Sequence, residues 1–148
     1  MKIFEHLLIP TDFGESSARA LDLAVKLAVE LGASLTLLHV YEIPMYGYTG
    51  MEMAAVDLLT PIEDAAREQL ATTLADVKRK VPAAKSLLRR GVVWREIVAT
   101  IEETHPDLVV MGTHGRHGVS HVLLGSVADK IVRTSPVPVL TVREAKPQ

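Results

Sequence analysis

Short apolar runs alternate along this chain with longer segments whose apolar residues recur at helical spacing. The apolar runs fall at residues 3–9, 34–40, 85–88, 108–111 and 137–142. Each has the length and composition of a buried β-strand, and helical segments separate them. The pattern predicts a βαβ series, in which a parallel sheet is covered by helices on both faces and the crossovers are right-handed.

Four helices are expected, at residues 16–31, 60–80, 94–104 and 126–133. The first opens among Ser16 and Ser17 and stops at Gly32, which readily adopts the left-handed conformation of a C-terminal cap. In the second, Thr60 is the expected N-cap and Glu63 completes a capping box.

These elements fit one α/β domain over residues 1–148, an open five-stranded parallel sheet with strand order 3-2-1-4-5. No internal repeat or linker divides the chain. The segment 41–59 is irregular, nearly uncharged and rich in Met and Tyr. It is a lid, a partner-binding flap or a partly disordered connection, and we favour the last of these interpretations.

Composition narrows the classes of function. The 148 residues carry 16 basic and 18 acidic side chains, a formal charge of −2, which gives no broad attraction to nucleic acid or anionic lipid. There is no cysteine, which excludes disulfides, thiolate zinc sites and thiol catalysis. The N-terminus lacks the features of a signal peptide, and no apolar run is long enough to span a bilayer. We expect a cytoplasmic protein that binds a small ligand or a protein partner.

The expected strand order brings two polar loops together. In open parallel sheets, ligands bind beyond the carboxyl ends of the strands, at the point where the strand order reverses. Here the first strand ends in IPTDFGESS and the fourth in MGTHGRHGVSHVLLGS. Pro10, Thr11 and Asp12 are therefore expected to face the segment 112–126.

The second of these loops has the features of a phosphate site. Gly112 and Gly115 permit positive φ and a close approach of the backbone, and Gly125 leaves space where Ser126 opens a helix. The unpaired amides and positive dipole end of that helix suit an oxyanion. In the alternative interpretation, the glycines only form turns and Ser126 only caps its helix.

Side chains near this loop suit the rest of a nucleotide. Arg116 or His117 can neutralise outer phosphates, and Asp12 suits a ribose hydroxyl or a metal ion. The backbone beside Val40 can receive the edge of an adenine.

The spacing Gly112-x2-Gly115-x9-Gly125-Ser126 resembles the nucleotide-binding signature of the universal stress protein family, G-x2-G-x9-G-[S/T]. The segments HLLIPTDFGESSARAL, PDLVVMGTHGR and LLGSVADKIVRTSPVPVLTV also resemble family segments, so the resemblance spans nearly the whole chain. It implies an adenine nucleotide alpha hydrolase-like fold, bound ATP and a homodimer. We expect magnesium to accompany the ATP, with Asp12 as its ligand. The implied function is that of a nucleotide-dependent regulator in stress response or signalling. The long insert after the second strand departs from the family pattern and leaves the access route to the site open.

The resemblance also implies roles for individual residues. On the adenosine side it places Pro10, Thr11, Asp12 and Val40, with Met111 beside the base or ribose. On the ribose and phosphate side it places Gly112, Gly115, Gly125, Ser126 and Val127, while Arg116 and His117 lie in the variable interior of the motif.

Two other functions stay open. The first is a slow ATP hydrolase or phosphotransfer enzyme with magnesium on Asp12; the chain lacks a G-x4-G-K-[ST] loop, and no second acidic motif falls beside the phosphates. The second is a metal-binding module, because His114, His117 and His121 crowd one loop at H-x2-H-x3-H spacing.

The last expected strand, from Val137 through Val142, is apolar on both faces. Pro138 lacks a ladder donor, which sheets tolerate at their edges. Because an exposed apolar edge invites aggregation, we expect this strand to pair with its twin in a homodimer, as the resemblance also implies. A monomer whose last strand is covered only by its own helices is the alternative.

Overall fold

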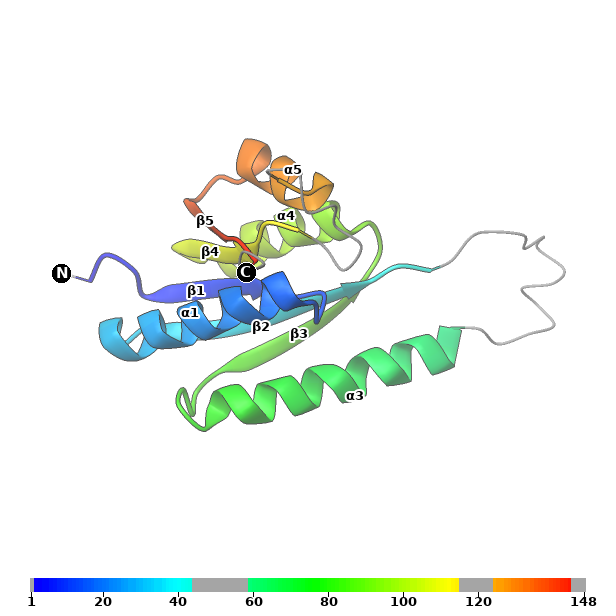
Figure 1. The fold of residues 1–148 in the computed structure, drawn as a ribbon, viewed down its shortest axis with the longest axis horizontal. Helices are drawn as coiled ribbons and strands as arrows, with labels where there is room; N and C mark the ends of the chain where they lie inside the picture. Colours follow the sequence, from blue (N-terminus) through cyan, green and yellow to red (C-terminus); the bar gives the residue numbers. More distant parts are fainter. Residues whose placement is uncertain (1, 44–58, 115–123, 145–148) are drawn as a thin grey trace, which may run out of the picture.

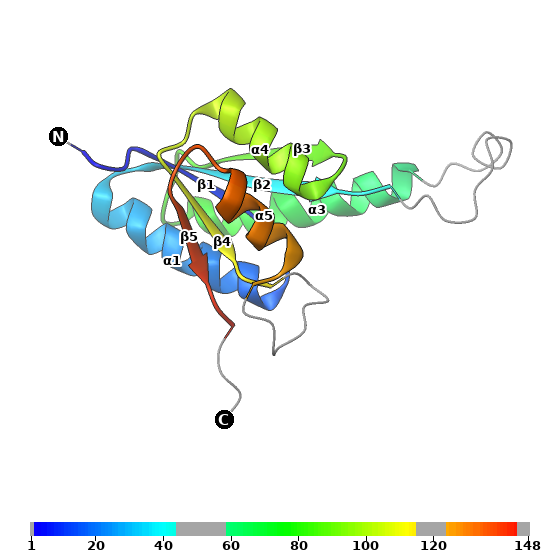
Figure 2. The same ribbon diagram turned by 90° about the horizontal axis from the view of Figure 1, so that it is seen from above.

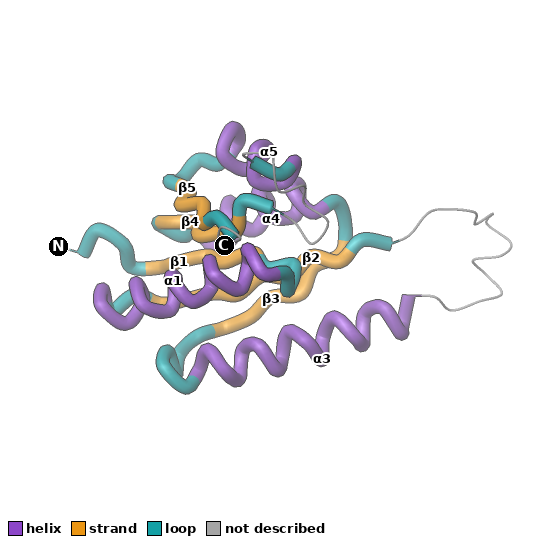
Figure 3. The backbone as a smooth tube through the Cα atoms, viewed as in Figure 1, coloured by secondary structure: helices purple, strands orange, loops and turns teal. Residues whose placement is uncertain are grey.

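The computed structural model describes residues 2–43, 59–114 and 124–144, in which strands and helices alternate (Figures 1 and 3). The elements are β1 (His6–Pro10), α1 (Glu15–Leu31), β2 (Ser34–Tyr41), α3 (Leu59–Lys78), β3 (Lys85–Arg90), α4 (Val93–Thr104), β4 (Leu108–Gly112), α5 (Ser126–Thr134) and β5 (Val139–Val142). No helix within these ranges has both the length and the apolar character that crossing a membrane requires.

The five strands form one parallel sheet in the order β3-β2-β1-β4-β5, as predicted. Alternate side chains of each strand enter two separate cores. Leu7 and Ile9 of β1 lie in the core beneath α1 and α3, whereas Leu8 lies in the core beneath α4 and α5. Figures 1 and 2 show the two helix layers on opposite faces of the sheet. Burial on both faces explains why the central strands are continuous apolar runs.

The first predicted strand was placed too early. β1 begins at His6, and Ile3 is 80% exposed. The carboxylate of Asp107 sets this boundary, because its Oδ2 accepts hydrogen bonds from the backbone N–H groups of Glu5 and His6 at 2.7 and 2.8 Å. The last strand also starts later than predicted, at Val139, and Pro138 precedes it.

Helix ends follow the predicted chemistry in one case and not in another. Gly32 caps α1 with φ of 64°, and its N–H donates to the carbonyl of Ala28, as expected. The prediction that Thr60 is the N-cap of the next helix is wrong, because α3 begins at Leu59. Pro61 is then the third residue of the helix, where its missing N–H costs no intrahelical hydrogen bond. Most of the irregular segment 41–59, namely residues 44–58, lies outside the described residues.

Candidate functional site

A crevice opens at the carboxyl end of the sheet because β1 and β4 stop pairing early. Their register ends at Leu8↔Val109, whereas β1 pairs with β2 as far as Pro10. The N–H of Thr11 donates to Leu38 of β2 at 2.8 Å. Since successive amides of a strand point to opposite sides, Pro10 faces β4, where it has no N–H to donate. Pro10 thus ends the hydrogen bonding between β1 and β4 at the reversal of strand order, which is where a crevice was predicted.

The pocket in this crevice has a volume of about 190 Å³. Nine of the twelve predicted site residues line it: Pro10, Thr11, Asp12, Val40, Met111, Gly112, Gly125, Ser126 and Val127. The other three, Gly115, Arg116 and His117, lie outside the described residues. The strand order therefore brings together residues that are more than a hundred positions apart.

Seven further residues line the pocket and were not predicted as part of the nucleotide site: Ser17, Leu38, Val93, Ile97, Thr113, His114 and Ala128. Two signals in the sequence could have indicated some of them. Leu38 precedes Val40 by two residues and so shares its face of β2. Val93 and Ile97 are four apart, which places them on one face of α4, but the sequence does not show that this face reaches the pocket.

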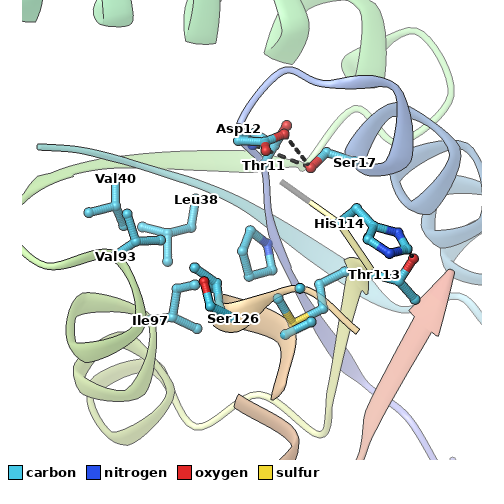
Figure 4. A pocket seen from close by; sticks show the side chains of 16 residues that line it. Thr11, Asp12, Ser17, Leu38, Val40, Val93, Ile97, Thr113, His114 and Ser126 are labelled. Atoms are coloured by element: carbon cyan, nitrogen blue, oxygen red, sulfur yellow. Dashed lines mark hydrogen bonds between the residues drawn. The ribbon is translucent and has the colours of Figure 1, made fainter. Parts of the chain in front are cut away.

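The apolar end of the pocket is formed by β2 and α4. Leu38, Val40, Val93 and Ile97 gather there, while Asp12 and Ser17 lie at the other end (Figure 4). Leu38 and Ile97 are each only 1% exposed, so their positions are fixed by the surrounding core. A flat apolar ring fits such walls better than a charged group does.

At the polar end, the loop after β1 fixes the carboxylate of Asp12. Its Oδ1 accepts hydrogen bonds from the N–H of Gly14 and the hydroxyl of Ser17, each at 2.8 Å (Figure 4 shows the second of these). In the part of the chain that the structure describes, no donor contacts Oδ2. One carboxylate oxygen is therefore held by the protein, and the other can accept a ligand hydroxyl or a metal ion.

The amino end of α5 forms another polar wall. Gly125 is its N-cap, with φ of −70° and ψ of 165° and no side-chain capping hydrogen bond. The interpretation of Ser126 as a cap is therefore wrong, since it is the first residue of the helix. The amides of Ser126, Val127 and Ala128 have no acceptor within the helix, and Asp129 is the first to donate, to Gly125. All three residues line the pocket, so unsatisfied donors and a positive dipole end lie beside it.

The two ends of the glycine loop are joined at its base. The N–H of Gly125 donates to the carbonyl of Thr113 at 2.6 Å, and the N–H of Thr113 donates to Val142 of β5 at 2.9 Å. Gly112 is not among the described residues with positive φ, so the conformational freedom that glycine permits is not used there. Glycine is required there for a different reason, since a Cβ would lie 2.7 Å from the carbonyl carbon of Ser16.

Of the three histidines considered as metal ligands, the structure describes only His114. His114 lines the pocket and its Nδ1 lies 2.9 Å from the hydroxyl of Thr113. His117 and His121 lie outside the described residues. Within residues 2–43, 59–114 and 124–144, no three histidine or acidic side chains gather into a metal-binding group.

Solved structures with the same fold include nucleotide complexes. A universal stress protein in complex with cAMP is 23% identical, with a TM-score of 0.69, and covers 97% of this chain and 99% of its own. A universal stress protein family protein from Arabidopsis thaliana with AMP bound is 14% identical, with a TM-score of 0.69, and covers 95% and 92%. The universal stress protein UspA from Lactobacillus plantarum is 23% identical, with a TM-score of 0.84, and covers 95% and 98%. The predicted adenine nucleotide alpha hydrolase-like fold is confirmed.

Sequence comparison leads to the same family. The universal stress protein A homolog 1 of Coxiella burnetii is 33% identical over 141 residues, which cover 94% of this chain and 96% of the relative. The model of the universal stress protein family matches residues 4–143. With nearly its whole length matched, and with Gly112, Gly125 and Ser126 of the glycine signature lining the pocket, the chain belongs to the universal stress protein family.

Proposed function

We propose that this protein binds an adenine nucleotide, ATP in the first place, in the pocket between β1 and β4 and acts as a nucleotide-dependent regulator in the stress response. One observation carries the proposal. A single pocket combines an apolar end, a fixed carboxylate and the free amides of a helix N-terminus. These three parts match the base, the ribose and the phosphates of a nucleotide.

The apolar end fits the adenine ring. The walls from β2 and α4 present aliphatic side chains, and Pro10 and Met111 also line the pocket. Burying a planar ring against aliphatic carbon is favourable, and the backbone of Val40 offers polar groups to its edge.

The carboxylate and the helix N-terminus fit the polar parts of the ligand. The free oxygen of Asp12 can accept a hydrogen bond from a ribose hydroxyl or hold magnesium on the phosphates. The amides of Ser126, Val127 and Ala128 can donate to a phosphate, whose negative charge the dipole of α5 stabilises. The relatives that bind cAMP and AMP support the same class of ligand.

The first test is a calorimetric titration of ATP with magnesium into the dialysed protein and into Gly125→Val. Valine tolerates the backbone angles of this position, φ −70° and ψ 165°, so the substitution fills the phosphate region without straining the chain. We expect saturable binding by the wild-type protein and none by Gly125→Val. Ala99→Val, which adds valine at an exposed position of α4, serves as the control and should bind normally.

The state of the nucleotide after the titration separates a binding protein from an enzyme. Intact ATP is the result expected of a regulator. ATP consumed by the wild-type protein and spared by Asp12→Ala would favour the slow hydrolase instead. A wild-type protein that takes up no adenine nucleotide contradicts the proposal. Repeating the titration with EDTA in place of magnesium tests whether the metal takes part.

We further propose that residues 1–148 act as one cytoplasmic domain that forms a homodimer through β5. In the described part of the chain, β5 pairs with β4 on one side and has no strand on the other. Its four residues are all half-buried in the single chain, so pairing with a second copy would remove apolar surface from water. The regulated protein partner would then bind a dimer.

A further inference from the structure

The loop that carries Asp12 contains a strained residue. Phe13 has φ of 63°, in the left-handed region that aromatic side chains rarely adopt. Such a conformation persists only where the surrounding structure imposes it, and it often marks a functional site. Phe13 does not line the pocket, whereas the two residues that precede it, Thr11 and Asp12, do.

The imidazole ring of His39 packs against the ring of Phe13. The two ring centroids are 4.3 Å apart with the planes tilted by 41°. His39 lies on β2 between Leu38 and Val40, which line the pocket, so its side chain points to the opposite face of the sheet. Phe13 packs on that same face, against the core beneath α1 and α3.

His39 also contacts the backbone of the pocket wall. Its Nδ1 lies 2.7 Å from the carbonyl oxygen of Thr11. Because a carbonyl can only accept, Nδ1 must carry the proton, and this fixes the orientation of the imidazole. The carbonyl, the N–H and the hydroxyl of Thr11 each make a hydrogen bond. Besides the contact with His39, its N–H donates to the carbonyl of Leu38, and its hydroxyl accepts from the N–H of Phe13 at 3.0 Å.

From this geometry we propose that Phe13 and His39 are positioning residues for the nucleotide, an inference that rests on the proposed function. The ring contact keeps Phe13 in its left-handed conformation, and the His39 hydrogen bond fixes the carbonyl of Thr11. Together they aim the carboxylate of Asp12 into the pocket before the ligand arrives. A ligand that meets a preformed carboxylate does not have to order the loop, which strengthens binding.

The test uses a matched pair of substitutions at one position. In His39→Asn the side-chain amide nitrogen can take the place of Nδ1 and donate to the carbonyl of Thr11. In His39→Gln the side chain is longer, so its amide nitrogen lies near the place of Nε2 and cannot make this hydrogen bond. A third variant, Phe13→Leu, keeps an apolar side chain and the strain but removes the ring. Two quantities are measured: the Kd for ATP with magnesium, and amide hydrogen exchange at residues 12–14 in the ligand-free protein.

We expect His39→Asn to stay within about twofold of the wild-type Kd, and His39→Gln and Phe13→Leu to bind about tenfold more weakly, the effect of one lost hydrogen bond or ordered contact. In these two variants the amides of Asp12, Phe13 and Gly14 should exchange faster, while the amides of Leu7 and Val109 keep wild-type protection. A general loss of stability would speed exchange throughout the protein and would not be reversed by asparagine. Faster exchange confined to this loop, with normal binding in His39→Asn, therefore indicates a positioning role.

Several outcomes are decisive. Wild-type Kd and wild-type exchange in both His39→Gln and Phe13→Leu would overturn the inference, and should His39→Gln fail to fold, Phe13→Leu alone decides in the same way. Equal losses in His39→Asn and His39→Gln would also overturn it, because the Nδ1 donor would then be irrelevant. If the wild-type protein binds no adenine nucleotide but the exchange pattern appears as expected, the proposed function fails while the support of the loop stands.

Discussion

At the scale of single residues, Gly112 packs tightly against Ser16 beside the site. A side chain at Gly112 would contact the hydroxyl, the Cβ and the backbone of Ser16, whose carbonyl carbon would lie at 2.7 Å. Since backbone cannot move aside cheaply, we expect Gly112→Ala to lower the free energy of unfolding by about 2 kcal/mol. Urea denaturation measures this.

Gly14→Ala provides the comparison for that experiment, because Gly14 has ordinary extended angles, φ −82° and ψ 176°. Its cost should stay below about 1 kcal/mol, the usual range for an N-cap change. Equal effects of the two substitutions would show that the approach to Ser16 does not constrain Gly112.

His6 makes stability depend on pH at the opposite end of the sheet. Burial lowers the pKa of His6 below its usual 6.5, against the opposing effect of nearby Asp107, and Nε2 lies 2.8 Å from the hydroxyl of Thr36. Below pH 6.5 the unfolded chain therefore takes up a proton that the folded chain resists. The contribution of His6 is fully present above pH 6.5 and is lost as the pH falls through the lower, folded-state pKa.

We expect the unfolding free energy of His6→Gln to fall less steeply than that of the wild type as the pH is lowered from 6.5. Denaturant titrations at several pH values would check this. A wild-type slope in His6→Gln would assign the pH dependence to other groups.

At the scale of elements, the sequence predicts the type and order of the strands and helices that the structure describes. It does so because burial on both faces of the sheet requires continuous apolar runs, and because Gly32 and Ser126 mark the end of one helix and the start of another. It misplaces ends where a distant side chain decides. Asp107 sets the start of β1 from a hundred residues away. Likewise, Val93 and Ile97 complete the pocket only because α4 crosses beside β2, which local periodicity cannot reveal.

The end of α1 offers a test that isolates backbone conformation. A Cβ on Gly32 would contact only the tip of Lys2, at 3.4 Å, so its φ of 64° is the main constraint. Gly32→Ala should lower the unfolding free energy by about 1 kcal/mol, and Gly32→Asn by less, because asparagine accepts the left-handed region more readily. Thermal melts of both variants check the ranking, and a more damaging asparagine would point to Lys2 instead.

At the scale of the whole molecule, the outer edge of β5 can be tested without disturbing its inner edge. The carbonyls of Pro138 and Val142 accept hydrogen bonds from β4 and the residue after it, so the amides of Val139 and Thr141 point outward. Thr141→Pro removes one outward donor and leaves the β4 ladder intact. In the proposed dimer this variant should be monomeric at micromolar concentration, while Thr141→Ala and the wild type stay dimeric.

Sedimentation or light scattering gives the masses for that comparison. If Thr141→Pro is dimeric, the interface does not involve β5. If the wild-type protein is monomeric, the proposal of a dimer is wrong.

The carbonyl of Val142, on the inner side of β5, joins this strand to the ligand pocket. It accepts the N–H of Thr113 at 2.9 Å and the hydroxyl of Ser16 at 3.1 Å, and Ser16 in turn accepts the N–H of His114 at 3.4 Å. Thr113 and His114 line the pocket, so the last residue of β5 and the pocket wall share one hydrogen-bond network. If nucleotide shifts this network, then by thermodynamic reciprocity self-association must shift nucleotide affinity by the same factor. The dimer would then report the local nucleotide concentration, and protein concentration would tune the response.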